Sequence, residues 1–300
     1  DILRRRLGFD GIVVTDWNLL ESEDMAGMEF GPNGWGLEHL TPLERAAIAL
    51  DVGVDQFGGD RNAALIEELV DSGRITESRI DESIRRLLRE KFRLGVFENR
   101  RVDTAATAEI CGSPAFTAAG VEAQRTSLVL LADRGDRIAD GARVLLDGVD
   151  ARAASDAGLV PVDDLAEADA VVVRLDAPFE PGKGSLGDFF RGGSLEFDAA
   201  TVAKIARYSA AAPVYLSVYL ERPAVLTPMT DSSTMLIGDF GAADAVVLDA
   251  FRGIAPLTGI LPFDIPSSMA AVEASREDVP FDTADPLFLH GTGLRTAPRA

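Results

Sequence analysis

Short apolar segments that alternate with helical segments constrain the fold of this chain more than any other feature. In the first third of the chain the expected order is a strand at 9–17, a helix at 43–50, a strand at 54–57, and helices at 62–71 and 77–94. Thr41 followed by Pro42 marks the start of the first helix, because threonine caps a helix and proline suits its first turn. Strands that alternate with helices predict an α/β fold with a parallel sheet.

A second block of the same kind follows a stretch without periodicity. Strands are expected at 127–132, 144–146, 170–175, 214–219 and 234–239, and helices at 199–211 and 242–252. This order predicts a doubly wound sheet, and we expect loops with one edge strand at 261–295. The predicted organisation is therefore an α/β unit at 1–97, a linker at 98–117, and a second α/β unit at 118–300.

Charge and composition exclude several classes of function. Lysine and arginine total 29 against 49 aspartates and glutamates, a formal net charge of −20 that repels phosphate backbones and anionic lipid. We therefore expect neither nucleic acid nor a membrane as a partner, and no apolar run approaches the ~18 residues of a membrane span. One cysteine and two histidines cannot form an internal disulfide or a Cys/His metal site.

Asp16 is the first candidate for a catalytic residue. It stands where the first apolar run ends, beside Trp17, and α/β folds place their ligands at the carboxyl ends of parallel strands. A carboxylate beside an indole suits a sugar, whose C–H face stacks on the ring while its hydroxyls need polar partners. An aspartate after a strand also commonly caps a turn, and the pattern alone favours neither interpretation.

Five segments of the chain, in order, resemble segments of the family 3 glycoside hydrolases. The run GFDGIVVTDW at 8–17 is similar to the segment that carries the nucleophile of the family, at the seventh strand of its barrel. The other four segments are ALDVGVD at 49–55, RIDESIRRLL at 79–88, LTGILPF at 257–263 and PLFLHGTGL at 286–294. Each segment alone is a weak signal, but the set spans nearly the whole chain.

The resemblance implies a fold and a reaction. The expected fold is the C-terminal portion of a (β/α)₈ barrel followed by a six-stranded α/β sandwich domain, with the active site between them. The implied function is a retaining, exo-acting β-glycosidase, most simply a β-glucosidase, on a β-linked glucoside or short oligosaccharide. Asp16 would be the nucleophile that forms a glycosyl-aspartate, and a second carboxyl group about 5–5.5 Å away would act as acid and then as base. No cofactor and no metal are implied.

The second carboxyl group is expected in a loop that follows the strand at 170–175. The segment DAPFEPGKG at 176–184 resembles the acid/base loop of the plant-type exoglucanases of the family, although it departs from that loop in the position of its carboxylates. We favour Glu180, because its longer side chain on a loop held by proline and glycine can reach across an interface. Asp176 is the second candidate and Glu196 the third. Each could instead be a solvated loop carboxylate.

Three further side chains are candidates for the mouth of the substrate site. The resemblance implies that Trp17 forms a wall on the aglycone side, and Met28 and Trp35 lie in the long glycine-rich loop that follows it. A methionine or tryptophan in such a loop can equally be packing.

The first 97 residues supply only two strand–helix units, whereas a (β/α)₈ barrel takes about 250 residues. We therefore expect an N-terminal barrel segment of the same enzyme as a partner, and the chain by itself could be inactive. A non-catalytic carbohydrate-binding or scaffold fragment is the alternative function. A nucleotide-binding protein ranks lower, because no Gly-x-Gly-x-x-Gly turn follows a strand.

Overall fold

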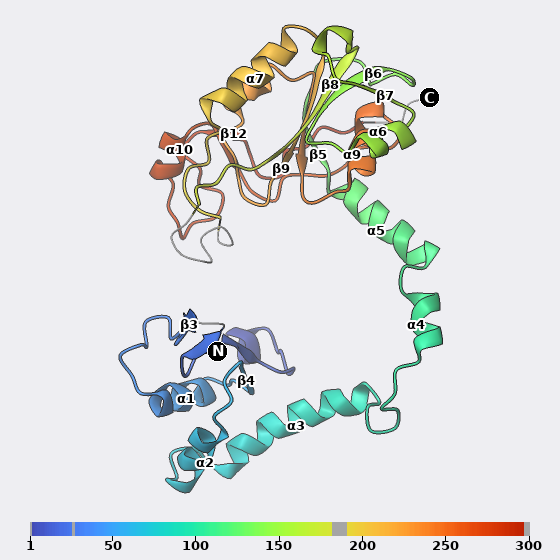
Figure 1. Ribbon diagram of the computed structural model, residues 1–300. Helices are drawn as coiled ribbons and strands as arrows, with labels where there is room; N and C mark the ends of the chain where they lie inside the picture. The colour runs from blue at the N-terminus through green and yellow to red at the C-terminus, as the bar shows by residue number, and fades with distance from the viewer. Residues whose placement is uncertain (1, 26–27, 182–190, 297–300) are drawn as a thin grey trace. The chain divides into compact units, whose positions relative to one another are not determined.

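A computed structural model of the chain describes residues 2–25, 28–181 and 191–296. The chain divides into two compact units, Asp1–Thr107 and Ala108–Ala300 (Figure 1). The division falls within the segment expected as a linker, but that segment is not irregular. It contains α4 (Thr104–Ile110) and the start of α5 (Pro114–Ser127). Both helices begin at caps, since the Asp103 carboxylate accepts from two backbone N–H groups and the Ser113 hydroxyl from one.

The described part of the first unit, before α4, has a small parallel sheet, a hairpin, one short π-helix and three α-helices. Its elements are η1 (Ile2–Arg6), β1 (Val14–Trp17), β2 (Glu23–Met25), β3 (Met28–Phe30), α1 (Pro42–Asp51), β4 (Gln56–Gly58), α2 (Ala63–Asp71) and α3 (Glu77–Arg93). Strands β1 and β4 pair in parallel, and β2 and β3 form an antiparallel hairpin. A core of Leu20, Ala46, Ala47, Leu50, Leu69 and Ile75 lies between the helices and the loop after β1.

The start of α1 follows directly from the sequence. The Thr41 hydroxyl accepts from the Glu44 N–H while the Glu44 carboxylate accepts from the Thr41 N–H, which is a complete capping box with Pro42 at the first helical position. Strand β1 covers the end of the apolar run at 9–17, and it is not buried. Val14 is 52% exposed, because β1 pairs only with β4 in the described part of the chain.

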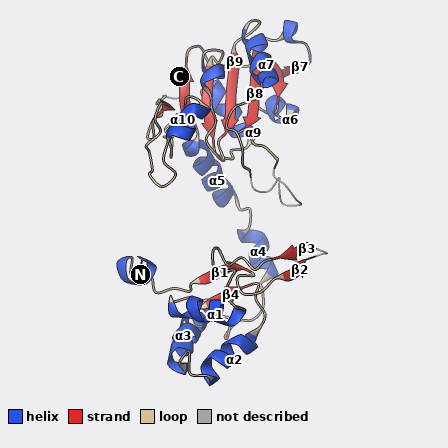
Figure 2. Cartoon of the chain, turned by 90° about the vertical axis from the view of Figure 1, so that its left-hand side faces the viewer, coloured by secondary structure: helices blue, strands red, loops and turns tan. Residues whose placement is uncertain are grey.

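The second unit is built on one six-stranded sheet. The strands are β5 (Val129–Asp133), β6 (Arg143–Asp147), β7 (Val160–Val162), β8 (Ala170–Asp176), β9 (Val214–Tyr219) and β10 (Met235–Asp239), in the order β5-β10-β9-β8-β6-β7. Only β5 runs antiparallel to its neighbour, at one edge of the sheet. Figure 2 shows these strands side by side in red. The predicted α/β class is confirmed, with a mostly parallel sheet.

Helices cover both faces of this sheet because its strands are apolar on both sides. Val171 and Val173 pack on one face with α7 (Ala199–Ser209) and α8 (Thr227–Thr230), whereas Ala170 and Val172 pack on the other face. That other face carries α6 (Ala151–Asp156) and α9 (Asp244–Arg252), so α7 lies on the opposite side of the strands from α9 (Figure 1). A short 3-10 turn, η2 (Leu165–Glu167), precedes β8.

The C-terminal segment is more ordered than predicted. Residues 261–295 were expected to hold loops with one edge strand, but β11 (Ile265–Pro266) and β12 (Pro286–Phe288) pair with each other, and α10 (Met269–Ala274) lies between them in sequence. This pairing joins strands about twenty residues apart, and periodicity within either short segment cannot reveal it.

Candidate active site

Asp16 and Trp17 stand at the carboxyl end of β1 with their side chains exposed. The Asp16 Oδ1 atom accepts from the Trp17 N–H at 2.8 Å, and Trp17 is 55% exposed. Gly58, the last residue of β4, and Gly59 after it let the indole approach the backbone closely. A Cβ atom at Gly58 would lie 3.0 Å from the Trp17 ring, and one at Gly59 would lie 2.7 Å from it. The end of the strand pair therefore presents a carboxylate and an aromatic surface together.

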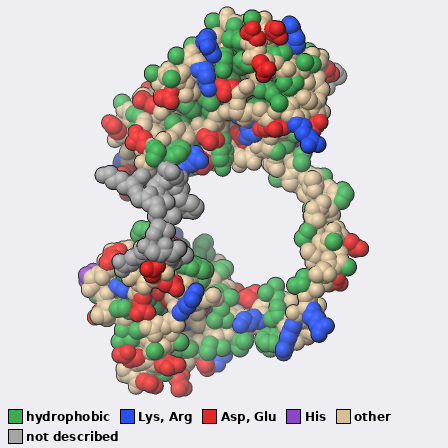
Figure 3. Space-filling model, viewed as in Figure 1, with side chains coloured by type: hydrophobic (Ala, Val, Ile, Leu, Met, Phe, Trp, Pro, Cys, Tyr) green, Lys and Arg blue, Asp and Glu red, His purple; other side chains and the backbone are tan. Residues whose placement is uncertain are grey.

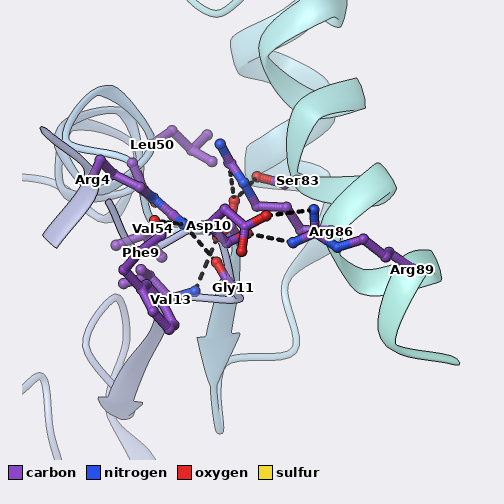
Figure 4. Close-up of polar contacts among 12 residues, drawn as sticks. Arg4, Phe9, Asp10, Gly11, Val13, Leu50, Val54, Ser83, Arg86 and Arg89 are labelled. Atoms are coloured by element: carbon purple, nitrogen blue, oxygen red, sulfur yellow. Dashed lines mark hydrogen bonds and ion pairs between the residues drawn. The ribbon is translucent and has the colours of Figure 1, made fainter. Parts of the chain in front are cut away.

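A buried carboxylate, Asp55, holds the other end of the same strand pair. Its contacts are with four residues labelled in Figure 4, namely Arg4, Val13, Ser83 and Arg86. Its Oδ2 atom accepts from the Val13 N–H at 3.0 Å and also from Arg4, and its own N–H donates to the Val13 carbonyl at 2.8 Å. Its Oδ1 atom accepts from the Ser83 hydroxyl at 2.7 Å and from Arg86 at 2.8 Å. One side chain thus ties η1, β1, β4 and α3 together.

The electrostatics of Asp55 follow from these contacts. Burial alone would raise the pKa of Asp55, but the hydrogen bonds from the Val13 N–H, Ser83 and Arg86, together with the charge of Arg86, lower it below its usual value. The carboxylate is therefore ionised and fully paired at neutral pH. Its role is to position β1, since it lies at the opposite end of the strand from Asp16.

Two more arginines of α3 hold the segments before β1 and β4. Arg79 donates to the Leu50 carbonyl at 2.9 Å and to the Val54 carbonyl at 2.7 Å, and Arg89 donates to the Asp10 carboxylate at 3.0 Å. Sequence reasoning gave these side chains no role. The spacing of Arg79, Ser83 and Arg86, which places them on one helical face, was the available signal.

In the second unit, the structure brings the three acid/base candidates together. Asp176, Glu180 and Glu196 line one pocket of about 470 Å³, together with the aromatic rings of Phe179 and Phe197. Asp176 is the last residue of β8, and Glu180 and Glu196 lie in the chain that follows. The pocket therefore lies at the carboxyl end of a parallel strand, where α/β sheets bind ligands. Residues 182–184 of the predicted loop lie outside the described residues.

Arg191 contacts this loop, and the sequence analysis did not identify it as a site residue. Its guanidinium lies 4.4 Å from the centre of the Phe179 ring, 3.9 Å from the Asp176 carboxylate and 2.9 Å from the Glu221 carboxylate. Asp176 is therefore engaged by a cation. These contacts join residues twelve or more apart in sequence, so no local pattern could have indicated them.

The two loop candidates for the mouth of the substrate site, Trp35 and Met28, lie in different surroundings. Trp35 is 77% exposed with a φ of 47°, and Asn33 in the same loop donates to the Trp17 carbonyl at 2.8 Å. That bond connects the loop to the end of β1. Met28 lies in β3, and its side chain lies outside the described residues.

The described part of the chain has an acidic surface and no cluster of metal-binding side chains. Acidic side chains are spread over both units on the face shown in Figure 3, in keeping with the net charge of −20. Among the described residues, no group of three or more histidine, cysteine, aspartate or glutamate side chains could hold a metal ion. No described helix is long and apolar enough to cross a bilayer.

Comparisons with known proteins show which proteins this chain resembles. Residues 1–90 match the glycosyl hydrolase family 3 N terminal domain. The probable beta-glucosidase C of Aspergillus flavus is 40% identical over 302 residues, which cover 99% of this chain and 48% of that protein. A periplasmic beta-glucosidase/beta-xylosidase of Dickeya chrysanthemi is 38% identical over 312 residues, which cover 98% of this chain and 47% of that protein. The first 90 residues thus resemble glycosyl hydrolase family 3, and the chain as a whole is β-glucosidase-like.

The fold comparison agrees. The crystal structure of a beta-glucosidase from Listeria innocua matches with a TM-score of 0.73 at 18% identity, over 98% of this chain and 48% of that one. This likeness shows the shared fold. The chain spans about half the length of the curated relatives it matches.

Proposed function

We propose that this chain carries the two catalytic carboxylates of a retaining, exo-acting β-glucosidase. The observation that carries the proposal is the exposed Asp16–Trp17 pair at the carboxyl end of β1, in a chain 40% identical to β-glucosidases over 99% of its length. Asp16 is the nucleophile and Glu180 is the acid/base. Trp17 and Trp35, with Met28, contact the leaving-group side of the substrate.

The reaction takes two displacement steps. The Asp16 carboxylate attacks the anomeric carbon while Glu180 donates its proton to the glycosidic oxygen, so the C–O bond breaks and the aglycone leaves as an alcohol. Glu180, now a carboxylate, takes a proton from water. The resulting hydroxide-like oxygen attacks the glycosyl-aspartate, which releases glucose with retained configuration and restores both carboxyl groups.

The surroundings of the three pocket carboxylates support the choice of Glu180. The Asp176 carboxylate is already paired with the Arg191 guanidinium, 3.9 Å away. Glu196 forms a bridge with Val225, which fixes its backbone in a strand-like pairing. Asp176 and Glu196 are the second and third candidates.

The same proposal includes the finer fold. The β1–α1 and β4–α2–α3 units form the end of a (β/α)₈ barrel, and the second unit is the α/β sandwich domain of the family. The parallel pairing of β1 and β4 supports this, as do the exposed apolar side chains of Leu7, Phe9 and Val14. The partner that would cover such a surface is an N-terminal barrel segment of the same enzyme.

The substrate class is a β-linked glucoside or short oligosaccharide. Its support comes from the relatives, whose names include beta-glucosidase and beta-glucosidase/beta-xylosidase, and from structures of the Listeria innocua enzyme in complex with glucose and laminaribiose. The exposed indole of Trp17 supplies the stacking surface that a pyranose ring needs.

The first test is hydrolysis of 4-nitrophenyl β-glucoside by the 300-residue chain and by the enzyme at its full natural length. Asp16→Asn should abolish turnover and leave glucose binding largely intact, because the amide keeps the shape but cannot form the glycosyl ester. A matched control is Asp71→Asn, at an exposed carboxylate of α2 in the same unit.

A fluorinated slow substrate gives a second readout. 2,4-Dinitrophenyl 2-deoxy-2-fluoro-β-glucoside should leave a glucosyl adduct on the peptide that contains Asp16, detected by mass spectrometry. Binding of glucose with no turnover at full length would support the carbohydrate-binding alternative. An adduct on another carboxylate would exclude Asp16 as nucleophile.

A further inference from the structure

The Glu180 side chain lies against a glycine turn. The Glu180 N–H donates to the Gly192 carbonyl at 3.0 Å, and the two residues form an isolated antiparallel bridge. The next residue, Gly193, has a φ of +75°, and a Cβ atom there would lie 2.5 to 2.7 Å from the Cβ, Cγ and Cδ atoms of Glu180. Only a residue without a side chain permits this approach, so the stem of Glu180 rests on the backbone of Gly193.

An arginine that follows the neighbouring strand fixes this turn. Arg222 donates through Nη1 to the Gly192 carbonyl and through Nη2 to the Gly193 carbonyl, the second bond at 2.8 Å. Arg222 follows β9, which runs parallel to and beside β8, the strand that leads to Glu180. The ends of the two strands therefore supply the carboxylate and its support from the same edge of the sheet.

The arginine acts on the turn and not directly on the carboxylate. Both of its bonds go to backbone carbonyls, and the forked guanidinium holds them in a fixed relation that a single ammonium group cannot reproduce. A glutamate side chain free to rotate would spend most of its time in other rotamers. A turn clamped against its stem reduces that freedom.

We propose that Arg222 and Gly193 are positioning residues for the acid/base, and that this arrangement assigns the acid/base role to Glu180 among the three pocket carboxylates. The inference rests on the proposed function. Arg222 holds the Gly192–Gly193 turn, the turn holds the stem of Glu180, and the carboxyl group is kept where it can protonate the leaving group. Proton transfer depends steeply on such placement.

The test uses the enzyme at its full natural length and compares two glucosides. One has a good leaving group, 2,4-dinitrophenolate, which departs without a proton. The other has a poor one, methanol, which needs the acid. Glu180→Ala should lower kcat/KM for the methyl glucoside by about 10²- to 10⁴-fold and affect attachment of the dinitrophenyl glucoside to Asp16 far less.

Arg222→Ala should show the same selectivity at a smaller size, about 10- to 100-fold on the methyl glucoside. Arg222→Lys should fall between Arg222→Ala and the wild type, because an ammonium group can still donate to one of the carbonyls. Gly193→Ala should reproduce the selective loss, since its Cβ atom displaces Glu180. If Arg222→Ala does not fold, Arg222→Gln takes its place, with the intermediate loss expected of Arg222→Lys because its amide nitrogen can still donate to one of the carbonyls.

Two matched controls belong to the same unit. Arg152→Ala removes an arginine whose side chain is 89% exposed, and Gly158→Ala adds a methyl group at a φ of +78° with no atom within 4 Å. Neither should change the ratio of the two rates. Thermal unfolding of each variant separates a loss of positioning from a loss of fold.

The outcomes distinguish the inference from the function on which it rests. The positioning role would be overturned if Glu180→Ala lost activity selectively on the methyl glucoside while the Arg222 and Gly193 variants lost none, or lost it equally on both glucosides. An equal loss on both glucosides in Glu180→Ala would overturn the acid/base assignment while the Asp16 adduct remained. A wild-type enzyme that hydrolyses neither glucoside would overturn both.

Discussion

Gly148 and Gly158 share a backbone conformation but differ in what surrounds them. Their φ angles are +76° and +78°, both in the left-handed region that favours glycine. A Cβ atom at Gly148 would lie 2.3 Å from the Arg174 carbonyl oxygen, whereas a Cβ atom at Gly158 would have no other atom within 4 Å. The pair therefore separates backbone strain from steric clash.

We expect Gly148→Ala to lower the free energy of unfolding of the second unit by about 1–3 kcal/mol more than Gly158→Ala does, because the clash adds to a shared strain. The measurement is urea unfolding followed by tyrosine fluorescence, since all three tyrosines, Tyr208, Tyr215 and Tyr219, belong to this unit. Equal losses in the two variants would mean that the turn after β6 relaxes without cost.

At the scale of elements, the Asp55 contacts connect η1, β1, β4 and α3. Asp55→Asn should destabilise the first unit by about 3 kcal/mol, because it leaves Arg4 and Arg86 without their buried counter-ion. Fluorescence of Trp17 and Trp35 reports this unit selectively, since the chain has two tryptophans and both lie there. An unchanged unfolding midpoint would contradict the structural role of Asp55.

The stability difference between the wild type and Asp55→Asn should depend on pH. The pKa of Asp55 is lower in the folded chain than the value of about 3.9 for an unfolded aspartate. Its contribution to stability is therefore complete above pH ~4 and is lost as the pH falls through the folded pKa. The difference in unfolding free energy between wild type and Asp55→Asn should be largest near neutral pH and shrink below pH ~4.

Asp51→Asn is the matched control for that measurement. Asp51 also pairs with an arginine, Arg74, and its pKa is also lowered, chiefly by the hydrogen bond from that arginine. Both side chains are about half exposed, so solvent screens the pair and its loss should change stability little. A loss as large as that of Asp55→Asn would show that burial is not what gives the Asp55 pairs their strength.

Local signals account for what the sequence predicted well. The start of α1 at Thr41 and Pro42 was read from neighbouring residues, and α3 begins and ends within one residue of the predicted helix. Strand β7 was missed because Pro161 stands at its centre, which argues against a strand in any local reading. The exposure of β1 was also missed, because it depends on how many strands flank it.

The candidate site divides in the same way. The carboxylates at Asp16, Asp176 and Glu180 were proposed from the ends of apolar runs and from family resemblance. The side chains that hold them were not. Arg222 contacts a turn about thirty residues away, and Asp55 reaches Arg4 across a separation of 51 residues. Such contacts depend on the tertiary fold and give no pattern among neighbouring residues in the sequence.

At the scale of the whole molecule, the proposed nucleophile and the proposed acid/base belong to different units. Asp16 lies in the first unit, and Glu180, Asp176 and Glu196 lie in the second. Variants of the two groups should therefore perturb different unfolding transitions. Asp16→Asn is expected to leave the tyrosine-detected transition of the second unit unchanged, which distinguishes a chemical defect from a general loss of fold.

The second unit should fold without the first. Its two apolar clusters, one on each face of the sheet, draw all their members from residues after 107, including Leu216 on one face and Phe251 on the other. The first unit has a far smaller core and exposes Leu7 and Val14. Burial on this scale is what makes a unit independently stable.

We therefore expect a fragment of residues 108–300 to unfold cooperatively, with a tyrosine-detected urea midpoint equal to that of the 300-residue chain. A fragment of residues 1–107, by contrast, should show a broad, weakly cooperative tryptophan-detected transition, because few of its apolar side chains are removed from water. A midpoint of the 108–300 fragment well below that of the longer chain would contradict the independence of this unit. It would mean that residues before 108 contribute to the stability of the sheet that carries Glu180.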